Sequence, residues 1–163
     1  MTTSDSNKNA KWLAITATGL AGIMAGGLTF LSLVDSPSIK GHIRDGNTQL
    51  ILDHFPIWWP HGRNMMVPLI GVGALANALA YKATSHRSWA WSGFLIFLLA
   101  PYTKLLMGED IETLRNADLS QVANTAIRFC NFHHGRSVMA LASFGLSLVG
   151  LADLNQNRGE KKL

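Results

Sequence analysis

The residues best suited to chemistry in this chain are a histidine and an arginine at the mouth of its last apolar run. Residues 137–152 carry no charge, which is typical of a helix that crosses a bilayer. Steps of three and four residues place His133 and Arg136 on one helix face, which continues toward Gly150 as small and hydroxylic residues. Such residues favour packing against other helices. We therefore expect both side chains to point into a bundle at its rim, whereas His134, about 100° round the helix, points elsewhere.

A histidine and an arginine at the rim of a helix bundle can have structural roles instead of a catalytic one. His133 and Arg136 can bind acidic loop residues such as Glu109 or Asp110, or they can bind a lipid phosphate. These structural roles stand beside any catalytic role.

The histidines do not form a convincing metal site. Adjacent His133 and His134 diverge on a helix, and His54 and His61 have no cysteine or carboxylate that completes a ligand set. No glycine-rich nucleotide loop is present. The sequence therefore predicts no metal and no bound cofactor.

The composition indicates an integral membrane protein. Of 163 residues 48% are hydrophobic and only 15% are charged, against roughly 25% charged in soluble domains. Four long uncharged runs account for the difference, and they predict an all-α, four-helix transmembrane bundle. Lysine and arginine beside the membrane explain the net charge of +4, so the expected partner is the lipid bilayer and no nucleic acid. The single cysteine, Cys130, allows no intrachain disulfide.

The element boundaries follow from the uncharged runs, their flanking charges and the prolines. We predict spans near residues 12–34, 64–82, 89–107 and 136–154, which form a single domain over residues 12–154. Residues 1–11 are expected to be a disordered tail and residues 155–163 a polar, basic tail.

The first connection is the longest. Pro37 is expected to end the first helix, since proline lacks the N–H that continues it. A loop of residues 35–63 would follow, and within it residues 49–59 predict a short amphipathic helix lying at the membrane interface. Trp58 and Trp59 fit the aromatic belt at headgroup level, and Pro60-His61-Gly62 would turn the chain.

Basic residues give an expected orientation. Both termini and the short link at residues 83–87 lie on one side, where lysine and arginine are denser than in the loops of the other side. Density favours both termini on the cytoplasmic side, or the matrix side in a mitochondrion.

The motifs and their order resemble the anthrone oxygenase-like family of four-span membrane proteins, and the resemblance covers nearly the whole chain. The clearest signature is an aromatic residue, a histidine four residues on and an arginine three further on, here Phe129, His133 and Arg136. Phe129 stands where tryptophan is usual. The other matching stretches are residues 22–37, Trp59 with Gly62 and Pro68, and Pro101-Tyr102-Thr103.

The resemblance implies an activity and roles for the residues. Family members with known roles oxidise anthrones to anthraquinones with O2, without metal or flavin. His133 would be the base that removes the acidic proton. Arg136 would disfavour the imidazolium form of His133 by like charge and stabilise the enolate oxygen. The residues expected to bind a flat aromatic substrate are Trp58, Trp59, His61, Tyr102, Thr103 and Phe129, with Tyr102 or Thr103 donating a hydrogen bond.

A non-catalytic role is the alternative prediction. Gly22 and Gly26 form a GxxxG pair in the first span, which lets a neighbouring backbone approach closely. The chain would then be a small subunit or assembly partner of a larger membrane complex, or a homo-oligomer.

Overall fold

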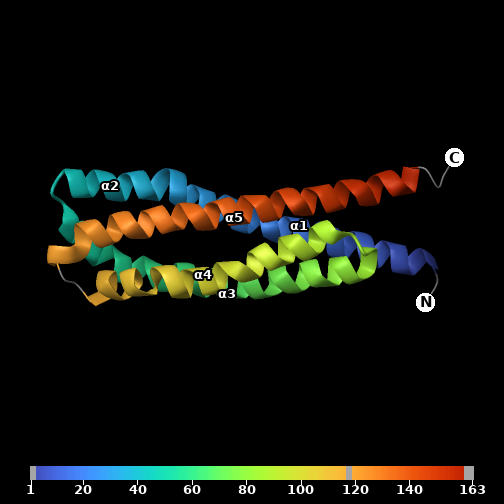
Figure 1. Ribbon diagram of the computed structural model, residues 1–163, viewed down its shortest axis with the longest axis horizontal. Helices are drawn as coiled ribbons and strands as arrows, with labels where there is room; N and C mark the ends of the chain where they lie inside the picture. Colours follow the sequence, from blue (N-terminus) through green and yellow to red (C-terminus); the bar gives the residue numbers. More distant parts are fainter. Residues whose placement is uncertain (1–2, 117–118, 160–163) are drawn as a thin grey trace.

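The computed structural model describes residues 3–116 and 119–159, which form a long helical bundle (Figure 1). Its elements are α1 (Thr3–Phe30), a π-helix η1 (Leu31–Asp35), α2 (Ser36–Arg44), α3 (Thr48–Thr84), α4 (Arg87–Asn116) and α5 (Leu119–Gly159). Within the described residues there is no strand. Because α1, η1 and α2 form one continuous rod, the bundle has four rods, and each is long and apolar enough to cross a membrane. The predicted all-α four-helix architecture is confirmed.

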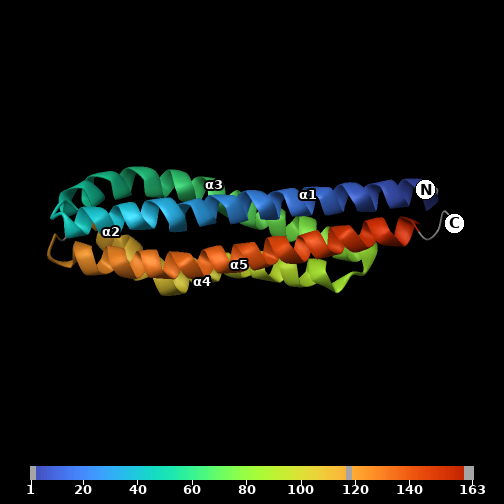
Figure 2. The ribbon, with the colours of Figure 1, turned by 90° about the horizontal axis from the view of Figure 1, so that it is seen from above.

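Both chain ends lie at the same end of the bundle as the α3–α4 turn, and Figure 2 shows the α1–α2 rod running beside α5. The turn is short because Ser85 adopts the left-handed conformation (φ 56°) directly after α3. The opposite end carries the connection from α2 to α3 and the passage from α4 to α5.

The rods are longer than a bilayer requires. They span about 45 to 63 Å at 1.5 Å per residue, against a hydrocarbon core of about 30 Å. Exposed apolar side chains such as Ile23, Val72, Phe97 and Leu141 gather in the half nearer the chain ends. The other half, built largely from residues 36–63 and 107–133, extends beyond this apolar zone. We call it the distal extension.

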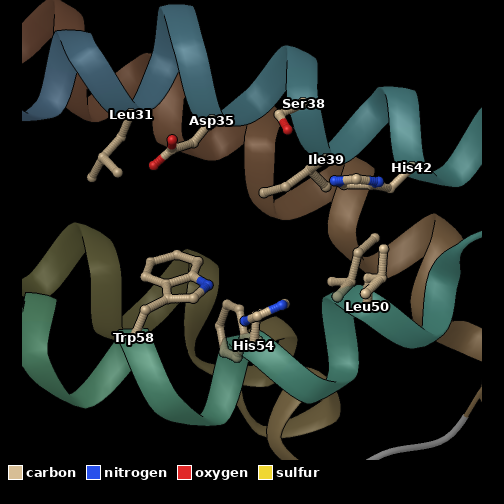
Figure 3. Close-up of a pocket in the computed structure, with 10 residues that line it drawn as sticks. Leu31, Asp35, Ser38, Ile39, His42, Leu50, His54 and Trp58 are labelled. Atoms are coloured by element: carbon tan, nitrogen blue, oxygen red, sulfur yellow. The ribbon is translucent and has the colours of Figure 1, made fainter.

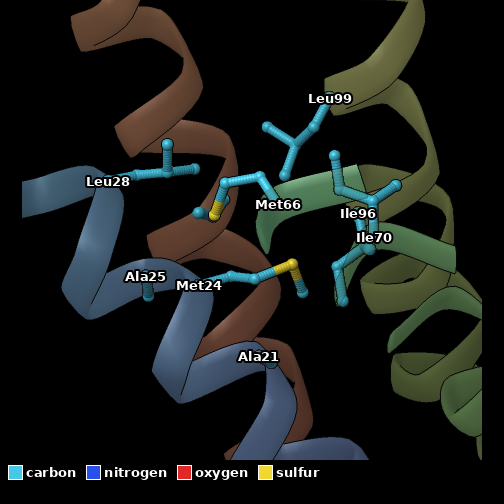
Figure 4. Packing of buried hydrophobic residues seen from close by; sticks show 9 residues of the cluster. Ala21, Met24, Ala25, Leu28, Met66, Ile70, Ile96 and Leu99 are labelled. Atoms are coloured by element: carbon cyan, nitrogen blue, oxygen red, sulfur yellow. The ribbon is translucent and has the colours of Figure 1, made fainter. Parts of the chain in front are cut away.

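Each half has its own packed core. In the apolar zone, side chains from α1, α3 and α4 converge around Met24, Leu28, Met66 and Leu99 (Figure 4). The distal extension has a separate apolar core in which α3, α4 and α5 meet, and its buried members include Phe55, Met107, Val122 and Phe129. The distal extension is therefore a folded part of the bundle.

The expected interfacial helix is wrong. Residues 49–59 belong to α3, which runs without a break through Pro56, Pro60 and Pro68, and Pro60-His61-Gly62 makes no turn. A proline lacks one backbone N–H, but the helix can continue through it when tertiary packing holds the neighbouring turns. Here Phe55 is buried in the distal core and fixes the segment as a bundle helix.

Pro37 also fails to end the first rod. The Ser36 N–H bonds the Leu31 carbonyl, five residues back, so one π-turn is inserted at Leu31–Asp35. Pro37 then lies in the first turn of α2, where its missing N–H costs little. The connection between the first two rods consequently shrinks to Asp45–Asn47.

The helices also extend into the expected tails. α1 begins at Thr3 and α5 continues to Gly159, so most of residues 1–11 and half of residues 155–163 are helical. The remainder of both tails lies outside the described residues.

Candidate functional site

His133 and Arg136 lie inside the bundle, as the periodicity of α5 predicts. Their exposed fractions are 4% and 5%, whereas His134 is half-buried and faces a different surface. No carboxylate of the described residues lies within 4.0 Å of the Arg136 guanidinium, and its buried Nε has no hydrogen-bond partner. A buried guanidinium without a counter-ion is costly for the fold. This is the feature that most needs a functional explanation.

The acidic residues expected as a structural partner for this pair bind another arginine. Arg128 donates from Nε to Asp110 Oδ1 over 2.6 Å, and its Nη2 contacts the same oxygen. Glu109 lies 3.6 Å from the same Nη2. The interpretation that Glu109 or Asp110 neutralises Arg136 is therefore wrong.

Two buried serines hold one edge of His133. Ser32 Oγ lies 3.5 Å from His133 Nδ1 and 2.6 Å from Ser137 Oγ, and Ser137 Oγ lies 2.7 Å from the Leu28 carbonyl. Ser32 belongs to η1, so the π-turn sets the phase that brings its hydroxyl to α5. We refer to Ser32 and Ser137 as the serine relay.

Four aromatic rings pack beside the histidine. Phe129 lies 6.0 Å from the His133 ring, between centroids, and meets Phe55, Trp58 and Trp59 edge-on at 5.4 to 6.4 Å. Such edge-to-face contacts are favourable for aromatic pairs. The side chains that the sequence assigned as flat walls thus form one cluster, in which Trp58 and Trp59 remain half-buried.

A small internal cavity joins the two candidate residues. It has a volume of about 40 Å³, and His133 and Arg136 border it together with Trp58, Trp59 and Arg63. It is too small for a drug-sized molecule, since ligand pockets measure roughly 300–1,000 Å³. Larger spaces lie on either side of it.

A cavity of about 580 Å³ lies between the first rod and α3 in the distal extension. Figure 3 shows Leu31 and Asp35 on the first rod facing Trp58 on α3, with His42 and His54 farther along. Leu31, Asp35 and Trp58 also border a narrow space that reaches His133. The large cavity, here called the distal cavity, therefore shares lining residues with the space that reaches His133.

A second space, a groove of about 330 Å³, lies between α3 and α4. Arg136 borders it from α5, with Trp59 and Arg63 on α3 and Thr103 and Lys104 on α4. Arg136 thus borders both this groove and the small cavity next to His133. We call this space the α3–α4 groove.

Three of the expected substrate residues behave differently. Tyr102 donates its hydroxyl to the Phe132 carbonyl over 3.1 Å, and Thr103 donates to the Leu99 carbonyl over 2.7 Å. Neither hydroxyl hydrogen is left for a substrate, although Thr103 borders the α3–α4 groove. His61 is exposed and borders none of the cavities described here, because the expected turn at this residue is a turn of helix.

Sequence reasoning missed Asp35 and the serine relay. The sequence predicts residue 35 to be the first of the loop 35–63, and Ser32 is not among the expected site residues. The signal for both is the π-turn, which shifts the facing of η1 relative to α1 and is not visible in hydrophobic periodicity. Serine residues in the last apolar run did point to close packing, and Ser137 lies at its start.

The described residues contain no group of three or more histidine, cysteine, aspartate or glutamate side chains arranged to hold a metal ion. No family model, curated protein or solved structure matches the chain in the comparisons. The resemblance noted from the motifs therefore remains a prediction, and the argument for function rests on the site itself.

Proposed function

We propose that the protein is a membrane-bound oxygenase that oxidises a flat, phenolic, membrane-soluble substrate of the anthrone type to a quinone with O2. His133 is the base and Arg136 stabilises the anion that forms. The observation that carries the proposal is the hydrogen-bonding order of the serine relay, because it defines which imidazole nitrogen is free.

The direction of each hydrogen bond in the serine relay follows from the carbonyl group that ends it. The Leu28 carbonyl can only accept, so Ser137 must donate its hydroxyl hydrogen there. Ser137 Oγ then accepts from Ser32, and Ser32 Oγ can only accept from Nδ1–H of His133. Neutral His133 is thereby held as the Nδ1–H tautomer. Its Nε2 carries the lone pair that a general base requires.

The proposed reaction needs no redox cofactor, because its atoms and electrons balance with O2 as the oxidant. Nε2 removes a proton from the CH2 group between two aryl rings, and the negative charge spreads to the oxygen of the ketone carbonyl on the central ring. The carbanion forms a C–O bond with O2, and the peroxide anion takes the proton back from His133 to give a hydroperoxide. Loss of water from the resulting hydroperoxide leaves a carbonyl, so one oxygen atom enters the quinone and the other leaves as water. Buried Arg136, which has no carboxylate partner among the described residues, supplies positive charge near the developing anion.

The distal cavity supports the substrate class. Its volume of about 580 Å³ is within the range of small-molecule sites, and its lining is mainly apolar with Phe55 and Trp58. Trp58 borders both the cavity and the space beside His133, as do Leu31 and Asp35. We expect Trp58 to turn when substrate enters, so that the reacting carbon reaches Nε2.

The test compares oxygen consumption by purified variants. A positioned base contributes roughly 10²–10⁴ in rate, so His133→Ala should lose about that factor with the bundle intact. Arg136→Lys should also be impaired, because an ammonium lacks the planar fork of donors. His134→Ala is the matched control and should retain most of the rate. Equal losses at His133 and His134 would contradict the assignment.

A non-catalytic role in a membrane assembly is the second candidate. Gly26 is exposed on α1 and a Cβ built there meets nothing within 4 Å, so this part of the GxxxG face is open to a neighbour. If the chain acts in this way, the native complex should contain stoichiometric partners, and His133→Ala should leave its cellular role nearly unchanged.

A further inference from the structure

We propose that the α3–α4 groove is a binding site for the headgroup of an acidic phospholipid, with Arg136 at its inner end. The proposal rests on the groove alone and does not depend on the oxygenase reaction.

The groove is strongly cationic. Arg63, Lys104, Arg115 and Arg136 border it, and Glu112 is the single acidic residue in its lining. Arg136 is nine-tenths buried and has no carboxylate partner among the described residues. An anion bound in the groove would provide the counter-charge that the fold itself does not supply. Phosphate oxygens suit this set, since guanidinium groups bind phosphate through paired N–H donors.

The groove lies at headgroup level. Arg63 precedes the uncharged run of α3, Lys104 follows that of α4, and Arg136 precedes that of α5. These three are the first charges met on leaving the apolar zone, and the bundle brings them to one place. Basic residues at this depth attract anionic lipids.

The groove also offers a path for an acyl chain. Val67, Ile70 and Ala100 form its apolar side, and Val67 is 59% exposed on the outer surface of the bundle. Cationic and apolar sides of one groove match the two parts of a phospholipid. A free phosphate ion would use only the first, which is why we infer a lipid occupant.

Native mass spectrometry of the purified protein in neutral detergent provides the test. The protein is titrated with phosphatidylglycerol and, separately, with phosphatidylcholine of the same acyl chains. The expected result is a tight one-to-one complex with phosphatidylglycerol, weakened roughly tenfold or more in Lys104→Gln/Arg115→Gln. The matched control, Lys82→Gln/Arg87→Gln, removes two charges at the opposite end of the bundle and should bind as the parent does.

Ala100→Trp gives a second, charge-neutral variant that fills the apolar side of the groove. It should also weaken binding, and thermal unfolding of each variant verifies that the fold is retained. Three results would each overturn the proposal. The first is equal binding of the two lipids, the second is an equal loss of lipid binding in the groove and control variants, and the third is unchanged lipid binding in Ala100→Trp. Displacement of the lipid by millimolar inorganic phosphate would show a free-anion site and would overturn the lipid assignment. Oxygen consumption is measured in a separate experiment, so that lipid binding and the proposed reaction can each fail without the other.

Discussion

Ser32 and Ser137 are the residues through which the bundle controls His133. Neither touches a substrate in our account, so they are positioning residues. In the proposed relay their hydrogen bonds fix a proton on Nδ1 and leave Nε2 free. An effect of this kind can be observed directly at the imidazole ring.

The tautomer provides the first prediction. Nitrogen NMR of the labelled protein should show neutral His133 with Nδ1 protonated, and Ser32→Ala should produce a mixture of tautomers because the acceptor at Nδ1 is lost. Ser143→Ala is the control, since Ser143 bonds Ser92 elsewhere in the bundle. A parent protein in which Nε2 carries the proton would refute the relay.

The ion pair in the distal extension gives a second prediction at this scale. Asp110 is fully buried and accepts from Arg128, so Asp110→Asn should lower the free energy of unfolding by about 1–3 kcal/mol. Glu109→Gln should change it little, because the Glu109 side chain is 85% exposed. Reversible unfolding in detergent measures both, and similar effects of the two variants would show that burial is not the cause.

Burial of His133 and half-burial of His134 could be predicted from α5 alone, because a 3.6-residue period separates adjacent residues by about 100°. The choice of Arg128, and not Arg136, as the partner of Asp110 could not be predicted. That choice depends on how α4 and α5 are aligned along their axes, which a pattern within one helix does not contain.

At the scale of the elements, the close approach of α4 to α5 depends on a missing side chain. Tyr102 packs over Gly135, and a Cβ built at Gly135 would overlap the tyrosine hydroxyl. The two helices are thus as close as a glycine allows at the level of Arg136.

This contact predicts a coupled pair of substitutions. Gly135→Ala should destabilise the bundle by about 1–3 kcal/mol through overpacking, and Tyr102→Phe should recover part of the loss by removing the hydroxyl. Gly145→Ala is the control on the same helix, because a Cβ there meets nothing within 4 Å. Thermal unfolding of the double-mutant cycle provides the coupling energy, and strictly additive effects would contradict direct contact.

The prolines explain why the first connection was not predicted. Pro37 and Pro60 are reliable helix stops when a helix stands alone, but the π-turn at Leu31–Asp35 and burial of Phe55 keep these segments helical. Four apolar runs identified the membrane-crossing parts. The continuation of the bundle rods into the distal extension in α2 and α3 was not predicted, because the apolar residues there are interspersed with charges and prolines.

At the scale of the whole molecule, two halves with different surroundings share one bundle. The half near the chain ends exposes apolar side chains, and the distal extension contains the distal cavity. His133 and Arg136 lie where the halves meet.

Substitutions on the outer face of α1 test whether the protein assembles with a partner or a second copy of itself. Gly26→Leu should leave the monomer stable, because the position is open, whereas Gly22→Leu should destabilise it because the Phe144 ring lies 3.1 Å from the Cβ position. Size-exclusion chromatography with light scattering would detect loss of a partner or second copy in Gly26→Leu. An unchanged assembly state in Gly26→Leu would count against the role of this face.

The most direct test of the proposed chemistry is oxygen uptake by purified protein supplied with an anthrone, after treatment with a chelator and without added flavin. We predict quinone formation with one O2 consumed per substrate, undiminished by the chelator and reduced roughly 10²–10⁴-fold in His133→Ala. Uptake that disappears with the chelator, or that persists in His133→Ala, would contradict a metal-free reaction in which His133 is the base.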